Sequence, residues 1–84
     1  MQHEADTLIL VANGPYISIV KVEGDVLSGQ AIIHAFQKPI MKVHFDSVRQ
    51  RVIAGGLDCQ IKFFELIRDE GELQLRLSYK MKLP

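Results

Sequence analysis

Seven short apolar runs, most of them separated by turn-forming residues, restrict this chain to an all-β fold. Seventeen of the 84 residues are β-branched, and such side chains favour the pleated surface of a sheet. Glycine, proline, asparagine or aspartate lies between most of the runs, as expected for tight turns. This pattern predicts seven antiparallel strands in a meander, sandwich or propeller. The runs cover residues 7–12, 16–23, 30–36, 40–46, 51–55, 60–66 and 72–81.

The faces of these runs differ. Residues 72–81 alternate apolar and polar side chains, which indicates a strand with one solvent-exposed face. Residues 17–22 and 61–66 carry apolar side chains on both faces, so we expect them in the middle of stacked sheets. A helix over residues 61–68 is the alternative, because Glu65–Arg68 contains acceptable helix formers.

The chain also contains an internal repeat. Residues 10–14 align with residues 52–56, and residues 17–22 align with residues 61–66, so that Ile17 and Ile61 lie 44 residues apart. Each unit ends in a lysine-containing segment and a proline. A repeat of this length lies within the range of propeller blades, about 40–50 residues.

Three segments resemble the strands of a WD-repeat blade. Residues 39–46 resemble its innermost strand, residues 51–58 its second strand and following turn, and residues 61–66 its third strand. Phe64-Glu65 stands where that family commonly has Trp-Asp, and no Gly-His dipeptide precedes Ile40. The resemblance implies about two blades of a β-propeller over residues 1–84: three strands of one blade in residues 7–37 and a full blade in residues 38–84.

Within that family, the chain is similar to late blades of a nucleolar subunit of the small-subunit processome. The similarity lies in residues 12–17, 25–29 and 55–64. It implies a non-catalytic scaffold in ribosome biogenesis and pre-ribosomal RNA processing, with other proteins of a multi-subunit complex as partners. The implied location is the nucleolus or nucleus, and the cytoplasm if the resemblance does not hold.

A propeller needs more strands than this chain supplies. Propellers contain about 4–8 blades of four strands, and each repeat unit buries its faces only against its neighbours. We therefore expect the remaining blades, or a neighbouring subunit, to cover the outer strands, since exposed apolar strands promote aggregation. The alternative is a small all-β domain that completes itself by self-association through its open edges.

The sequence predicts no catalytic, cofactor or metal site. His3, His34, His44 and Cys59 lack the paired short spacing of zinc ligands. The acidic residues Asp69, Glu70 and Glu72 lie in the least apolar stretch and indicate a solvated turn. One cysteine excludes an internal disulfide framework and fits a reducing compartment. The longest apolar run, residues 8–12, is too short to span a bilayer, and no secretory signal is visible, so no membrane partner is expected.

The turns supply the candidate contact residues, because loops on a rigid frame commonly carry binding sites. The candidates are Arg49, Gln50, Arg51 and Asp58. Asp58 is also expected to cap its own turn, with Gly55 and Gly56 forming a tight passage that requires small residues or a positive φ.

Basic side chains offer a second possibility. Lysines and arginines at positions 38, 42, 49, 51, 80 and 82 would line one rim and touch RNA phosphate. Ten basic residues balance ten acidic residues, so no general attraction to a polyanion exists. Lysines that protect strand ends from pairing are therefore the favoured interpretation.

Overall fold

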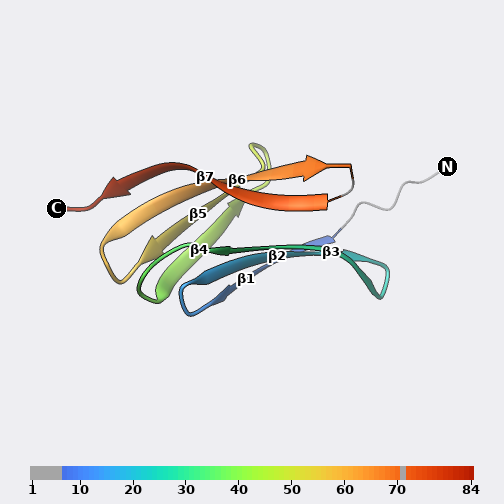
Figure 1. Cartoon of the computed structure of the whole chain (residues 1–84), viewed down its shortest axis with the longest axis horizontal. Helices are drawn as coiled ribbons and strands as arrows, with labels where there is room; N and C mark the ends of the chain where they lie inside the picture. The colour runs from blue at the N-terminus through green and yellow to red at the C-terminus, as the bar shows by residue number, and fades with distance from the viewer. Residues whose placement is uncertain (1–6, 71) are drawn as a thin grey trace.

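Two antiparallel sheets pack face to face in the computed structural model, which describes residues 7–70 and 72–84 (Figure 1). The first sheet has the order β1-β2-β3 and the second the order β4-β5-β6-β7. The strands are β1 (Thr7–Asn13), β2 (Tyr16–Glu23), β3 (Val26–His34), β4 (Ile40–Asp46), β5 (Arg51–Gly56), β6 (Gln60–Asp69) and β7 (Glu72–Lys82). The all-β prediction is confirmed. The helix considered for residues 61–68 is wrong, because these residues lie within β6.

The third strand begins four residues earlier than the sequence predicts. Ser28 and Gly29 looked like part of a turn, but β3 starts at Val26, directly after the Gly24–Asp25 turn. A register shift near Lys21 and Val22 accommodates the extra residue in β3, and a bulge of this kind lets a strand continue through an unpaired residue.

The turn between β1 and β2 also ties the two sheets together. Gly14 has a φ of 58°, and proline follows it, as in a two-residue hairpin turn with glycine at its first central position. The Pro15 carbonyl accepts hydrogen bonds from the Ala35 and Phe36 backbone amides at 2.9 and 3.2 Å. The Gly14 carbonyl accepts one from the Ile40 amide at 2.8 Å. The turn therefore fixes both the linker after β3 and the start of β4.

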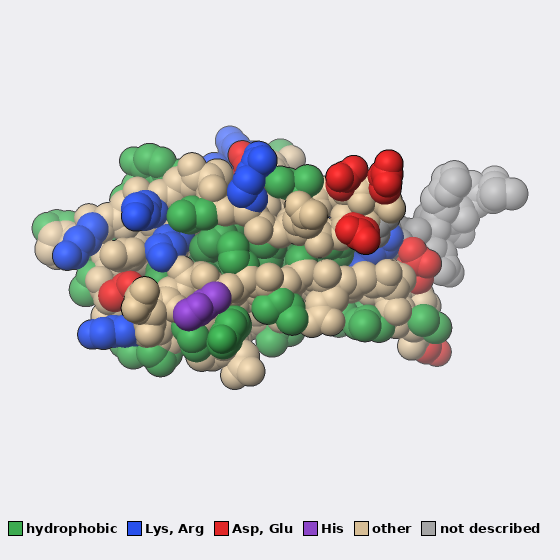
Figure 2. Space-filling view, viewed as in Figure 1, with side chains coloured by type: hydrophobic (Ala, Val, Ile, Leu, Met, Phe, Trp, Pro, Cys, Tyr) green, Lys and Arg blue, Asp and Glu red, His purple; other side chains and the backbone are tan. Residues whose placement is uncertain are grey.

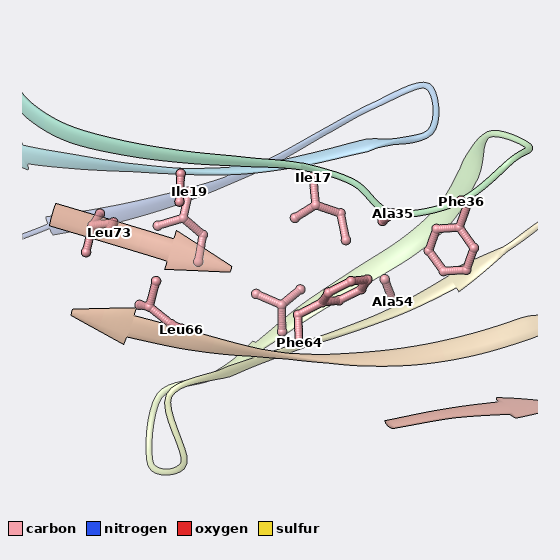
Figure 3. Close-up of a cluster of buried hydrophobic side chains, with 10 residues drawn as sticks. Ile17, Ile19, Ala35, Phe36, Ala54, Phe64, Leu66 and Leu73 are labelled. Carbon is pink, nitrogen blue, oxygen red and sulfur yellow. The ribbon is translucent and has the colours of Figure 1, made fainter. Parts of the chain in front are cut away.

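The core lies between the sheets (Figure 3). Most of its side chains come from alternate positions of the strands, and the consecutive linker residues Ala35 and Phe36 add to it. Ile17, Val52 and Phe64 are at most 1% exposed. Burial of one such side chain contributes about 1.5–3 kcal/mol relative to its exposure. The buried residues are Ile17, Ile19, Ala31, Ala35, Phe36, Val52, Ala54, Phe64, Leu66 and Leu73.

The apolar strands β2 and β6 each have only one face in this core. Both are inner strands of their sheets, but the prediction that stacked sheets cover both of their faces is wrong for the described chain, which has only two sheets. Ile17 and Ile19 of β2 point toward the second sheet, whereas Ile61 and Phe63 of β6 are only partly buried. The described chain therefore has an outward apolar face on β6.

The hairpin registers change the alignment of the two repeat units by one residue. Ala12 pairs with Ile17 in the first sheet, and Gly55 pairs with Ile61 in the second. Ala12 thus corresponds to Gly55, whereas the sequence alignment placed it against Ala54. A shift of one residue exchanges the two faces of a strand, so this correction decides which surfaces correspond between the sheets.

Phe36, in the linker, packs directly on Gly56. A Cβ at position 56 would lie 2.8 Å from Phe36 Cδ1 and 2.9 Å from Asp58 Oδ1. Phe36 is 2% exposed, and the Lys62 ammonium lies 4.7 Å from its ring centroid. Close approach, rather than an unusual φ, is the reason that glycine occupies this position.

We expect Gly56→Ala to destabilise the fold by about 1–3 kcal/mol, the usual effect of overpacking a filled site. Urea unfolding followed by circular dichroism gives the free energy. Gly55→Ala is the matched control, because a Cβ there meets nothing within 4 Å, and it should change stability by less than about 1 kcal/mol. An equal loss at both positions would contradict the close-approach explanation.

Candidate interaction surface

The outward side of the second sheet carries a continuous apolar surface. Strand register places Ile53 beside Phe63, Phe63 beside Tyr79, and Ile61 beside Met81. The Phe63 and Tyr79 rings lie 5.8 Å apart between centroids, and Tyr79 is 58% exposed. We call these five residues of β5, β6 and β7 the apolar outer face: Ile53, Ile61, Phe63, Tyr79 and Met81.

A hollow of about 450 Å³ opens at the β4 side of this face. Ile53 and Ile61 form its apolar wall, and Lys42 and His44 line its other side. Gly55 lies between them and has no side chain to fill the space. Shape and composition fit an apolar side chain of a partner, since binding pockets are mostly apolar with a few polar groups.

Asp46, at the end of β4, binds the polar groups that border the apolar outer face. Its Oδ1 accepts hydrogen bonds from the Val48 and Arg49 backbone amides at 3.1 and 3.2 Å. Its Oδ2 lies 3.2 Å from Arg49 Nη1 and 3.4 Å from Arg51 Nε. The Arg49 amide is the main cause that lowers the pKa of the Asp46 carboxyl, and partial desolvation opposes it.

Arg51 mainly stabilises the fold. Its guanidinium carbon lies 5.2 Å from the centroid of the Phe63 ring, and its side chain is 34% exposed. The ion pair with Asp46 and the aromatic contact hold the side chain against the sheet. Arg51 therefore joins the polar turn to the apolar outer face.

Arg49 and Gln50 lie in the turn between β4 and β5, but only Arg49 projects well into solvent, with a side chain 67% exposed. Gln50 has a φ of 51°. Its Nε2 donates to the Ser47 carbonyl at 2.7 Å, and its Oε1 accepts from Arg68 at 3.2 Å. Gln50 thus shapes the turn, and Arg49 presents the charge.

Asp58 lies at the opposite end of β5. Its Oδ1 accepts a hydrogen bond from the Gln60 amide at 3.2 Å, an arrangement that stabilises the turn between β5 and β6. Gly55 and Gly56 are the last residues of β5. The four candidate contact residues therefore form two separate groups, Arg49 to Arg51 at one end of β5 and Asp58 at the other.

The single basic rim, which the sequence offered only as the less favoured possibility, is not formed. Lys80 and Lys82 belong to β7 and pair with Lys62 and Gln60, near the start of β6. Arg49 lies in the turn at the other end of β5. Figure 2 shows most lysine and arginine side chains toward the end of the view nearest the C-terminus, and acidic side chains toward the opposite end.

Sequence reasoning did not single out Asp46. The signal was present, because this aspartate ends an apolar run and two arginines follow within five residues. Aspartate commonly accepts hydrogen bonds from the backbone two or three residues later. The outward position of Ile53 was harder to predict, because it depends on strand register.

The histidines and the cysteine, for which the sequence predicts no metal site, lie apart from one another where the structure describes them. His34 stacks on Tyr16 at 4.9 Å between centroids, Cys59 is exposed in the turn after β5, and His3 lies outside the described residues. Within residues 7–70 and 72–84, no three metal-ligating side chains come together. No helix in that part of the chain is long and apolar enough to cross a membrane.

No family model, curated protein or solved structure matches this chain.

We expect Asp46→Asn to flatten the dependence of stability on acidic pH. The folded pKa of Asp46 lies below its ordinary value of 3.8. The ionised carboxylate therefore stabilises the fold above that ordinary value, and this contribution is lost as the pH falls through the folded pKa. Urea midpoints measured from pH 7 to pH 2 should show a smaller acid loss in the variant. An unchanged pH profile would contradict this role.

Alanine substitutions should also distinguish the stability contributions of the two arginines that pair with Asp46. Arg51→Ala removes the packing on Phe63 and an ion pair, and should destabilise by about 1 kcal/mol. Arg49→Ala should cost less than about 0.5 kcal/mol, because the Arg49 side chain is mostly exposed and Asp46 keeps its ion pair with Arg51. Thermal unfolding of both variants at one protein concentration compares them. A larger loss at Arg49 would reverse the assignment.

Proposed function

We propose that this chain is a non-catalytic protein–protein interaction scaffold, a segment of a WD-repeat-like β-propeller. The apolar outer face carries this proposal. An apolar patch with aromatic residues and a polar border is typical of a protein contact. Here Phe63 and Tyr79 supply the aromatic part, and Asp46 with its arginines supplies the border.

The strand arrangement supports the propeller part of the proposal. In each sheet, neighbouring strands follow one another along the chain and run antiparallel, as in the four-stranded blades of a propeller. The second sheet has four strands, and its unit is repeated in the first sheet without a counterpart of β4. The remaining blades, or a neighbouring subunit, would then cover the apolar outer face.

Small-subunit ribosome assembly is the proposed setting of this scaffold, and the sequence resemblance to the nucleolar processome subunit supports it. Its partners would be other proteins of that complex, and its location the nucleolus. Arg49 is the charge of this turn best placed to touch such a partner, because its side chain is 67% exposed, whereas that of Arg51 is 34% exposed.

Quantitative affinity purification from the cells that make the protein tests this function. We expect the tagged chain to retain ribosome-assembly proteins, and Arg49→Glu to reduce their yield about tenfold, equivalent to about 1.4 kcal/mol. Lys80→Glu makes the same charge change on β7, away from the turn, and should leave the yield unchanged. Failure to retain any protein above an unrelated bait would contradict the scaffold, and diffuse fluorescence outside the nucleolus would contradict the ribosomal part.

An RNA-contacting module is the second candidate, and the lysines near the end of β7 favour it. Lys80 and Lys82 are exposed, and Lys38 is exposed in the linker. Binding of a fluorescent single-stranded RNA should then weaken steeply with salt, because lysine contacts to phosphate release counterions. Lys80→Glu with Lys82→Glu should abolish it. Binding that is absent, or insensitive to salt, would rule this module out.

A further inference from the structure

Each sheet has one outward face. Through the repeat, these two outward faces correspond to the two inner faces that pack on each other within the chain. The corrected repeat alignment places β1, β2 and β3 over β5, β6 and β7. The sheets do not pack with equivalent faces. The inner face of the first sheet corresponds to the outer face of the second, and the inner face of the second corresponds to the outer face of the first.

The apolar outer face of the second sheet repeats positions that are buried in the first. Ile17 and Ile61 correspond in the sequence repeat, and their pairing partners Ala12 and Gly55 therefore correspond as well. One step further along, Phe63 corresponds to Ile19, which is 1% exposed. Their partners on the next strand correspond as well.

On that next strand, Tyr79 pairs with Phe63 as Ala31 pairs with Ile19. Ala31 is 5% exposed because the second sheet covers it, whereas Tyr79 is 58% exposed. Tyr79 thus occupies the position of a buried residue but lacks the covering sheet.

The outer face of the first sheet repeats the buried side of the second. Ile9 pairs with Val20 as Val52 pairs with Phe64. Val52 is buried completely, whereas Ile9 is 47% exposed. Val11 occupies the position of Ala54 and is 40% exposed. The outer face of the first sheet therefore has the same register and apolar character as the face of the second sheet that covers the first sheet within the chain.

We infer that a second copy of this chain binds head to tail. The outer face of the first sheet in one copy covers the apolar outer face, on the second sheet, of the other copy. The contact would continue the packing between the two sheets of one chain. The inference depends on the apolar outer face as a protein-binding surface, which the proposed function also uses. A second copy is the occupant because the chain itself carries the matching face.

This contact joins unlike faces, so it is heterologous. A pair of copies therefore retains one unused face of each kind, one on each copy, so further copies add to form either a closed ring or a growing chain. Contact between like faces would instead give a symmetric dimer that uses only one of the two surfaces. Single-face variants distinguish these arrangements.

Sedimentation velocity of the wild-type chain and two charge variants tests the inference. Ile9→Glu blocks the outer face of the first sheet, and Tyr79→Glu blocks that of the second. We expect the wild type to be oligomeric at concentrations of about 10–100 µM, corresponding to a micromolar contact, and each variant alone to be monomeric. Circular dichroism verifies that both variants stay folded.

Mixing the two variants gives the decisive result. Ile9→Glu retains an intact outer face on its second sheet, and Tyr79→Glu retains one on its first. The mixture should therefore form a one-to-one dimer and nothing larger. Val48→Glu adds the same charge in the β4–β5 turn, at a side chain 87% exposed, and should remain oligomeric like the wild type.

Three results would overturn the inference: a monomeric wild type, a single variant that still self-associates, or a mixture without the dimer. If either variant fails to fold, Val11→Glu and Met81→Glu replace them, because both side chains are 40% exposed on the same two faces. A monomeric wild type that still retains partner proteins would remove the self-association and leave the proposed scaffold intact.

Discussion

The packing of the first sheet on the second is the interaction on which the rest of the structure depends. Neither sheet has a second covered face, so the apolar side chains between them provide the main burial available to the described chain. The linker keeps the sheets in that position, since carbonyls of the Gly14–Pro15 turn hold both the linker and the start of β4. Phe36 and Gly56 then make the linker part of the core.

Local sequence patterns predicted most of the fold. Alternation in residues 72–81 and the glycine-proline turn after β1 are short-range signals, and each strand was located from its own residues. The start of β3 was missed because Ser28 and Gly29 have turn-like side chains, although pairing with β2 keeps them in the strand. Pairing between strands is a long-range property that composition does not encode.

The candidate surface was less predictable for the same reason. A one-residue change in register decides whether Ile53 or Val52 faces outward, and this register follows from strand pairing, which the sequence alignment did not contain. The division of the candidate contact residues between the two ends of β5 follows from strand direction. Asp46, by contrast, acts within its own turn, so the local sequence contained the signal for its role, although the sequence analysis did not single it out.

The arrangement of charge has a consequence that the net charge of zero conceals. The hairpin of β6 and β7 has Asp69 and Glu72 at its tip, and Lys80 and Lys82 lie toward the other end of β7. Such a separation gives the molecule an electric dipole along this hairpin. Near a charged surface it would rotate before contact, within the screening length of about 8 Å at physiological salt, and so approach in one preferred orientation.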